Sequence, residues 1–257
     1  MSEQLKIMSF NIRVDQAGDN ENEFVFRKSR ILNFLNAERP DIIGFQEVSD
    51  NIRAWLVEAL DDYYIVGVGR QESMNGEGAP IAFRKDTLNL ISCETLMLSS
   101  SPSVFGSHYD GTDQSRCPRV YTKARFKHKN IDAPFYVYNV HTDHAGSLAR
   151  LLASNQVLQD INSHGEKFFL TGDFNARPED MEITAITENK ARSIKDATVS
   201  LGPTFHGFGQ SKNPAKIDYI FVDSSTEVVE AVRVEDNPGE GETYISDHNP
   251  IYIIANM

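Results

Sequence analysis

Polar side chains that could bind a metal ion or a phosphate stand at the ends of apolar runs throughout the chain. Four such runs are followed directly by a carboxylate, an amide or a histidine, and two near the C-terminus are preceded by one. The exits of some strands and the entrances of antiparallel ones can share one sheet edge, so these groups could meet. In chain order they are Asn11, Glu47, His141, Asp173, Asn175, Asp218, Asp247 and His248.

Four carboxylates, two amides and two histidines at one edge would suit a hard divalent cation beside a phosphate. Magnesium prefers oxygen ligands and usually keeps waters beside one or two carboxylates and a substrate phosphate. Zinc is not favoured, because the chain has no cysteine cluster and no close pair of histidines on a helix. His141 and His144 are three residues apart, but at a strand exit they need not share a face.

Each of these motifs also has a simpler interpretation by itself. Asp173 and Asn175 in Gly-Asp-Phe-Asn could bond to local backbone in a turn. Asp247 in Ser-Asp-His-Asn-Pro could belong to a capped loop, and His141 could be an ordinary half-buried histidine. Their occurrence together, all at the ends of predicted strands, favours a common site.

The predicted strands are short apolar runs bounded by turn residues. Strands outnumber helices, and the helices fall between some strands but not others, which favours mixed sheets with helices outside them. The predicted strands are 5–10, 41–48, 63–69, 135–140, 167–174, 216–222 and 249–255, with further strands within 81–98 and 119–126.

Helical periodicity marks four segments. One spans Ile31 to Leu35 before Pro40, and a second begins behind Ser49 and Asp50 and contains apolar residues from 52 to 60. A third runs from Leu148 to Ile161 and is closed by Gly165. A weaker fourth has Pro178 as its first residue and extends through Ile186. The four predicted helical segments are therefore 31–35, 52–60, 148–161 and 178–186.

The length of 257 residues and the lack of a linker or repeat predict a single domain spanning 1–257. Two long loops, 70–80 and 99–118, are rich in Gly, Ser and Pro and are of the kind that lines functional sites. No stretch of about 18 apolar residues predicts a membrane span. Cys93 and Cys117 have no metal or redox spacing and the start has no secretory pattern, so we expect reduced thiols in a cytoplasmic protein.

Six short motifs occur in order along the chain: SFN (9–11), QE (46–47), NVHTDH (139–144), GDFN (172–175), IDYIF (217–221) and SDHNP (246–250). Together they resemble the motifs of the endonuclease/exonuclease/phosphatase superfamily, the deoxyribonuclease I-like group, and in particular its uncharacterised bacterial branch. The resemblance extends from residue 5 to 255 and implies a four-layer α/β/β/α sandwich, with two mixed β-sheets face to face and helices outside.

The resemblance also implies a metal site. Glu47 matches the principal ligand of a divalent ion, Asn11 a metal or phosphate contact, and Asp247 a second carboxylate on the metal side. The implied ion is Mg²⁺, with Mn²⁺ as an alternative.

Five further residues match catalytic positions of the superfamily. Asp173 and Asn175 match the pair that positions the attacking water and the phosphate. His248 matches the histidine at the scissile phosphate, Asp218 the carboxylate that orients it, and His141 a second phosphate-facing histidine.

Two other residues belong to features of the narrower bacterial branch. Arg119 in SRCPRVYTKARF could hold a phosphate by bidentate bonds, or could form an ordinary ion pair at a strand edge. His206 in PTFHGF could reach the pocket, or could be an ordinary loop residue.

The expected activity is metal-dependent hydrolysis of a phosphate ester by in-line attack of water. The net charge of −12 and the lack of a basic, aromatic-rich insertion argue against an extended duplex DNA partner. The nearest basic cluster, FKHKN (126–130), is expected at a hairpin tip. A compact ester is therefore favoured: a short oligonucleotide, a nucleotide, a sugar phosphate or a lipid head group.

Two alternatives remain at this stage. One is an endonuclease, exonuclease or deadenylase-like enzyme that uses the same residues on nucleic acid. The other is a non-catalytic module that binds metal or phosphate, which the complete set of motif residues argues against. The sequence does not indicate the oligomeric state.

Overall fold

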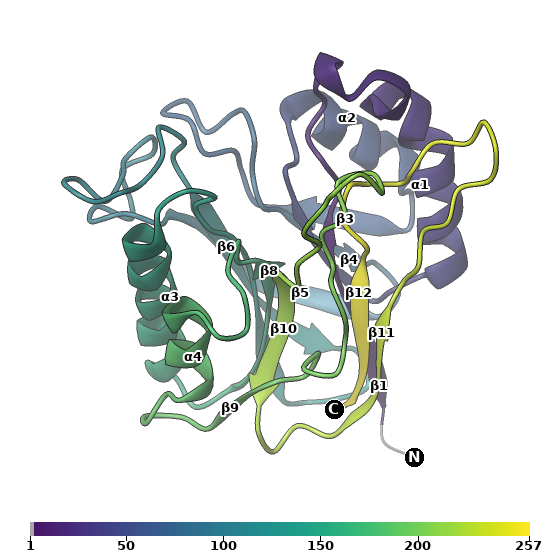
Figure 1. The fold of residues 1–257 in the computed structure, drawn as a ribbon. Helices are drawn as coiled ribbons and strands as arrows, with labels where there is room; N and C mark the ends of the chain where they lie inside the picture. Colours follow the sequence, from purple (N-terminus) through teal and green to yellow (C-terminus); the bar gives the residue numbers. More distant parts are fainter. Residues whose placement is uncertain (1–2) are drawn as a thin grey trace.

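The structure is a computed structural model that describes residues 3–257. Two six-stranded sheets pack face to face, and helices cover their outer faces (Figure 1). The first sheet has the strand order β11-β12-β1-β2-β4-β3. Its strands are β1 (Gln4–Asn11), β2 (Ile42–Gln46), β3 (Tyr63–Val66), β4 (Ile81–Arg84), β11 (Val228–Arg233) and β12 (Ile251–Asn256).

The second sheet has the order β5-β6-β7-β8-β10-β9. Its strands are β5 (Leu88–Met97), β6 (Val120–His128), β7 (Pro134–His141), β8 (Lys167–Asp173), β9 (Ile194–Asp196) and β10 (Asp218–Asp223). In Figure 1, α3 and α4 lie beside this sheet, whereas α1 and α2 lie on the other side of the molecule. The helices are α1 (Phe24–Glu38), α2 (Asp50–Ala59), α3 (Ser147–Asn162) and α4 (Met181–Thr187), with a 3-10 helix η1 (Ala17–Asn22). The predicted four-layer sandwich of two mixed sheets is confirmed.

Alternation along β8 shows how the sequence builds these layers. Successive side chains of a strand point to opposite faces, so an apolar run can face two cores at once. Phe168 packs in the core beneath α3 and α4, whereas its neighbour Phe169 packs between the two sheets. Both side chains are fully buried, and each such burial contributes roughly 1.5–3 kcal/mol to stability. A third core lies between the first sheet and α1 and α2.

Strand direction brings the exits of four strands to one edge. β1 and β2 run parallel, with Asn11 opposite Gln46, and β7 and β8 run parallel, with His141 opposite Asp173. β10 is antiparallel to β8 and its first residue, Asp218, is also opposite Asp173. The register therefore lines up three of the predicted site residues across the second sheet.

The predicted strands are present, but two details of the sequence interpretation are wrong. Pro178 does not begin the fourth helix: the chain first makes a turn in which Arg177 N–H donates to Asp180 Oδ2 at 2.7 Å, and the helix begins at Met181. Gly165 does not close the third helix, which ends at Asn162. Strands β9 and β11 were not predicted, because the first has three residues and the second has no fully buried one.

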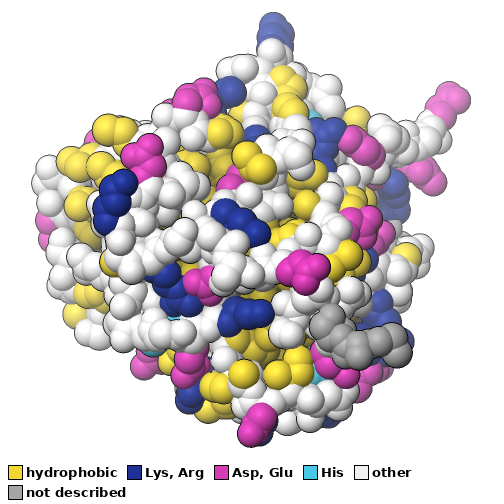
Figure 2. Space-filling view, turned by 90° about the horizontal axis from the view of Figure 1, so that it is seen from below, with side chains coloured by type: hydrophobic (Ala, Val, Ile, Leu, Met, Phe, Trp, Pro, Cys, Tyr) yellow, Lys and Arg dark blue, Asp and Glu magenta, His cyan; other side chains and the backbone are white. Residues whose placement is uncertain are grey.

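Within residues 3–257, no helix is both long and apolar enough to cross a bilayer. The segment 126–130 does lie at the hairpin between β6 and β7, as predicted. Figure 2 views the molecule from the side where the termini lie in Figure 1, and basic side chains on this face are scattered among acidic ones.

Candidate active site

Asn11 joins the two sheets at the edge where the strand exits meet. Its side-chain Nδ2 donates to Asp173 Oδ2 of the second sheet at 3.0 Å and to Glu47 Oε1 of the first sheet at 3.1 Å. Its Oδ1 accepts from the backbone N–H of Arg13 at 3.0 Å. Asn11 is buried beneath the pocket, so it positions two carboxylates that face the pocket.

Three residues just beyond strand ends have left-handed backbone conformations, which are uncommon for residues other than glycine. Arg13, Glu47 and Asn175 have φ angles of 61°, 62° and 48°. The surrounding hydrogen bonds hold these turns: Val14 N–H donates to Glu47 Oε2 at 2.8 Å, and Asn175 N–H donates to Asp173 Oδ1 at 2.9 Å. Such conformations occur often at functional sites, where neighbouring structure fixes them.

Arg13 lies between two of the predicted metal-binding carboxylates. Its guanidinium is 3.9 Å from Glu47 Oε2 and 3.7 Å from Asp247 Oδ2, and it donates twice to Asp19, at 2.9 Å each. The hydrogen bond to Asp19, and then the charges of Asp247 and Glu47, raise the pKa of Arg13 above its ordinary value. The two carboxylates thus converge on a position that already favours positive charge.

Asp173 is at the centre of the floor of the pocket. Burial and the nearby Asp218 carboxylate raise the pKa of Asp173 to about 7, against the opposing effect of His248. Its Oδ2 is 3.7 Å from His141 Nε2 and 3.8 Å from His248 Nε2. Two imidazole rings therefore flank one carboxylate oxygen at nearly equal distances.

His248 is held by a buried carboxylate. Its Nδ1 hydrogen-bonds to Asp218 Oδ2 at 2.9 Å, which leaves Nε2 directed toward Asp173. Burial alone lowers the pKa of His248, but attraction to Asp218, with smaller contributions from Asp247 and Asp173, outweighs it and raises the pKa to about 10. The ring of Phe205 packs edge-on against it, with centroids 5.1 Å apart. His248 is therefore a cationic donor at the floor of the pocket.

His141 is held by a guanidinium instead. Arg119 Nη1 donates to His141 Nε2 at 3.2 Å, and Nη2 donates to His144 Nδ1 at 2.8 Å. Because arginine can only donate, both imidazole nitrogens accept and both rings are neutral. Burial, and then the charges of Arg119 and Arg70, hold the pKa of His141 well below its usual range.

Asp143 fixes the loop that presents His144. Its Oδ1 accepts from the N–H groups of Ser115, Ala145 and Gly146 at 3.1, 3.0 and 2.8 Å, and its Oδ2 accepts from Ser115 Oγ at 2.5 Å. Burial would raise the pKa of Asp143, but these bonds outweigh it and lower the pKa to about 2. This carboxylate ties the loop 99–118 to the exit of β7.

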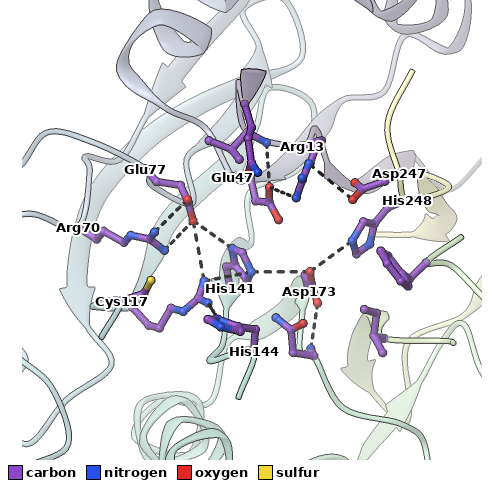
Figure 3. A pocket seen from close by; sticks show the side chains of 16 residues that line it. Arg13, Glu47, Arg70, Glu77, Cys117, His141, His144, Asp173, Asp247 and His248 are labelled. Atoms are coloured by element: carbon purple, nitrogen blue, oxygen red, sulfur yellow. Dashed lines mark hydrogen bonds and ion pairs between the residues drawn. The ribbon is translucent and has the colours of Figure 1, made fainter. Parts of the chain in front are cut away.

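The pocket above these residues has a volume of about 460 Å³. Figure 3 shows its labelled side chains: Asp173 and His141 lie near the centre, Asp247 and His248 on one side, and Arg70, Glu77 and Cys117 on the other. Glu77 is an acceptor for Arg70 at 2.6 and 2.9 Å, and burial raises the pKa of Glu77 against the effect of Arg70.

The structure brings most of the predicted site residues together. Asn11 and Asp218 lie directly behind the pocket, where they hold the residues that face it. Those that line it are Glu47, Arg119, His141, Asp173, Asn175, Asp247 and His248.

His206 does not join this group. Its Nδ1 accepts from Gly209 N–H at 3.0 Å and its ring packs near Tyr244, with centroids 5.2 Å apart. The preceding residue, Phe205, lines the pocket instead. The geometry gives no support for a phosphate contact by His206.

Sequence reasoning missed five polar residues of the pocket: Arg13, Gln16, Arg70, Glu77 and His144. The signals for some of them were present. Arg13 is two residues after Asn11, and both Arg70 and Glu77 belong to the long loop 70–80 that was expected to line a site. His144 was noted beside His141, but only the loop conformation decided that both rings meet at Arg119.

Comparisons with known proteins agree with the fold. A structure of an endonuclease/exonuclease/phosphatase from Bacteroides vulgatus is 30% identical, with coverage of 99% of both chains and a TM-score of 0.91. A mannosyl-6-phosphatase from Bacteroides thetaiotaomicron is 25% identical over 98% of this chain and 100% of that one, with a TM-score of 0.88. An uncharacterized protein, L388, from Acanthamoeba polyphaga mimivirus is 24% identical over 76% of this chain and 78% of the relative.

The family model described as the endonuclease/exonuclease/phosphatase family matches residues 8–248. That range includes every residue of the pocket, from Arg13 to His248. The family comprises hydrolases that act on phosphoesters. This chain therefore belongs to the endonuclease/exonuclease/phosphatase family.

Proposed function

We propose that this protein is a magnesium-dependent phosphoesterase that hydrolyses a compact phosphate ester by in-line attack of water. The observation that carries the proposal is the position of Asp173, whose Oδ2 lies 3.7 and 3.8 Å from the Nε2 atoms of His141 and His248. A carboxylate able to bind water lies here between two groups able to bind a phosphate. Membership of a family of phosphoester hydrolases supports the same conclusion.

The residues present fit a hard divalent cation. Glu47 and Asp247 offer carboxylate oxygens that face the pocket, where the guanidinium of Arg13 now lies between them, and Asn11 lies in contact with Glu47. Ligand atoms of Glu47, His141 and Asp173 also lie within 4.8 Å of one another, but His141 Nε2 is used by Arg119. Oxygen ligands of this kind suit magnesium, with manganese as an alternative. When bound, the ion would withdraw charge from the phosphate oxygens.

Asp173 is assigned to the attacking water. Asn175 N–H and Asn11 Nδ2 hold both of its oxygens, at 2.9 and 3.0 Å, so the carboxylate cannot rotate away from the pocket. A fixed carboxylate can orient a water for in-line attack and accept its proton. The side chain of Asn175, which also lines the pocket, is assigned to the phosphate.

The two histidines are assigned to the phosphate oxygens. His248, with Asp218 on its other nitrogen, offers a charge-assisted hydrogen bond that strengthens as negative charge develops in the transition state. His141 is the neutral partner on the opposite side, and Arg119 adds positive charge behind it. Asp218 acts through His248 and does not itself face the pocket.

A compact substrate agrees with the size and charge of the molecule. The pocket volume is about 460 Å³, and the net charge of −12 repels a long phosphate backbone. The mannosyl-6-phosphatase of Bacteroides thetaiotaomicron, which has a very similar fold, is named for a compact sugar phosphate. These observations favour a small ester over duplex DNA.

The test is a substrate panel with Mg²⁺ or Mn²⁺. It includes p-nitrophenyl phosphate, bis-p-nitrophenyl phosphate, sugar phosphates, nucleotides, poly(A) and nicked duplex DNA. We expect turnover of a small ester that EDTA abolishes and that falls ~10²-fold or more in Asp173→Asn. Salt-sensitive duplex binding followed by nicking would identify a nuclease. Metal binding without turnover of any ester would identify a non-catalytic module.

A further inference from the structure

Most of one wall of the pocket has no part in the proposed chemistry at the phosphate; the exception is Arg119, which supports His141. This wall consists of Arg70, Glu77, Cys117, Arg119 and His144, and we call these residues the outer wall. Figure 3 shows Arg70, Glu77 and Cys117 of this wall across the pocket from Asp247 and His248, with His141 and Asp173 between. A substrate held at Asp173 would therefore face the proposed metal ligands on one side and the outer wall on the other.

Glu77 is the acceptor on this wall. Its Oε1 is 2.6 Å from Arg70 Nη1, 3.7 Å from His141 Nδ1 and 3.9 Å from Arg119 Nη1, and its Oε2 accepts from Arg70 Nη2 at 2.9 Å. A carboxylate has about four lone-pair sites. The bonds to Arg70 therefore leave acceptor capacity on a side chain that lines the pocket.

Donors lie next to this acceptor. Arg70 lines the pocket, and each of its Nη atoms carries a second N–H beside the one that it directs at Glu77. His144 accepts from Arg119 at Nδ1, so its proton is on Nε2. An acceptor beside unused donors suits hydroxyl groups, because each hydroxyl donates once and also accepts.

There is room beside the outer wall for more than a phosphate. A second cavity of about 590 Å³ shares Arg70 and Cys117 with the pocket and lies between the loops that contain 70–75 and 106–118. Hydrogen bonds hold the first loop in place: Gly69 N–H donates to Met74 O at 3.0 Å within it, and Gly76 N–H donates to Asp50 Oδ1 of α2 at 3.0 Å. The walls are therefore shaped before a substrate arrives, which lowers the cost of binding.

The outer wall does not suit the other compact esters. Nucleobases are commonly held by stacking on aromatic rings, and among residues 3–257 the only Phe, Tyr or Trp that lines the pocket is Phe205, which packs against His248. A lipid tail would meet polar groups that it cannot pair.

We propose that the outer wall binds the alcohol part of the substrate and that this alcohol is polyhydroxylated, as in a sugar phosphate. Glu77 accepts hydrogen bonds from its hydroxyls, and Arg70 and His144 donate to them. This inference rests on the proposed phosphoesterase function and adds to it the residues that select the substrate. A site built to bind hydroxyls rejects an analogue that lacks them, because its buried polar groups are then unpaired.

The test compares a hexose 6-phosphate with cyclohexylmethyl phosphate, which has a similar shape and a primary alcohol as leaving group but no hydroxyls. With the Mg²⁺-loaded wild-type enzyme we expect kcat/KM to be ~10²-fold or more higher for the sugar ester. In Glu77→Gln this ratio falls ~10-fold or more, since an uncharged amide replaces the carboxylate acceptor. Arg70→Met is a second variant and lowers the ratio in the same direction.

Glu166→Gln is the matched control. Glu166 forms a two-bond pair with Arg125, at 2.8 and 2.6 Å, as Glu77 does with Arg70, but it does not line the pocket. The substrate ratio of this control should equal that of the wild type. If Glu77→Gln does not fold, as judged by circular dichroism, the result for Arg70→Met decides.

The outcomes separate this inference from the function on which it rests. Equal rates for the two esters, a clear preference for AMP over the sugar phosphate, or equal losses on both esters in Glu77→Gln would each overturn the inference alone. Lack of turnover of every ester, including the two p-nitrophenyl compounds, would overturn the proposed function and this inference together.

Discussion

The two histidines that flank Asp173 are alike in position, but one is neutral and the other is positively charged. His141 and His248 are 7% and 4% exposed, and their Nε2 atoms lie 3.7 and 3.8 Å from the same carboxylate oxygen. Burial lowers the pKa of both, yet His248 has a pKa raised to about 10 and His141 one held well below its usual range. The difference comes from their partners, a carboxylate for His248 and a guanidinium for His141.

This comparison shows that the partner of a buried imidazole, rather than its burial, sets its charge. Asp218 gains its position because β10 is antiparallel to β8, so that its first residue meets the last residue of β8. Arg119 gains its position from the end of the loop 99–118, immediately before β6. One partner is thus placed by sheet register and the other by a loop that Asp143 ties down.

The largest expected effect is a difference in kcat between substitutions of the two histidines. His248→Ala should lower kcat by ~10²-fold or more, because it removes a charged donor to the phosphate. His141→Ala removes a neutral group and should lower kcat only ~10-fold, since uncharged hydrogen bonds are about half as strong. Turnover of the best small ester from the panel checks both variants. Equal losses, or the reverse order, would contradict the assignment of charge.

The next effect concerns the carboxylate that holds His248. Asp218→Asn should lower kcat by ~30-fold, because a hydrogen bond to an ionised partner is worth about 1.5–3 kcal/mol and the ring itself remains. The same measurement of kcat applies, with circular dichroism to confirm folding. Asp223→Asn, at the other end of β10, is the control and should have normal turnover per folded molecule. An unchanged kcat in Asp218→Asn would show that His248 works without its partner.

Substitution of Asp143 tests the loop that positions Arg119 beside the neutral His141. Asp143→Asn should lower the free energy of unfolding by about 2 kcal/mol, because it weakens four hydrogen bonds to a charged acceptor. The folded-state pKa of about 2 is lower than the ordinary value of 3.8, so this stabilisation is present above pH 3.8 and is lost as the pH falls through 2.

Urea denaturation at several pH values measures this effect. The difference between the wild type and Asp143→Asn should narrow as the pH falls from about 4 to 2. Asp110→Asn, an exposed carboxylate in the same loop, is the control and should show a change within about 0.5 kcal/mol. A difference that stays constant with pH would mean that the charge of Asp143 has no part in it.

The smallest effect is expected from removal of the guanidinium beside His141. Arg119→Met removes a positive charge and the donor to Nε2, so the pKa of His141 should rise toward its ordinary value of 6.5. Histidine NMR signals followed against pH measure this shift, and kcat should fall by at most ~10-fold. Arg125→Met, on the same strand that Arg119 precedes, is the control and should leave His141 unchanged. If the pKa of His141 does not rise in Arg119→Met, its low value is due to burial alone.

Much of the fold followed from local patterns. Apolar runs such as 167–174 and 135–140 are strands because alternate residues face two different cores, and this leaves few alternative conformations. Boundaries were less certain where side-chain bonds compete with propensity. Pro178 has a backbone suited to a first helical turn, yet the bond from Arg177 N–H to Asp180 Oδ2 makes a turn there and delays the helix.

The candidate site was predictable where its residues stand at strand ends. Asp173, His141 and Asp218 meet because strand order and register place them opposite one another. The outer wall was not predictable in the same way, since Arg70 and Glu77 come together only through the conformation of their loop. His206 is the opposite case, a predicted site residue that does not line the pocket. It follows Phe205, which does line it, but its own ring packs near Tyr244.

Local sequence patterns identify the groups that this protein has for chemistry and place most of them at strand ends, because alternation and turn residues act locally. The roles matched to Glu47, Asp247 and Asn11 came from the resemblance of its motifs to those of a family. Only the tertiary structure decided the partners: Asp218 for one histidine, Arg119 for the other, and Arg13 between two carboxylates. Charge and hydrogen bonding depend on distances of a few ångströms between segments far apart in the chain, and those distances exist only after both sheets have packed together.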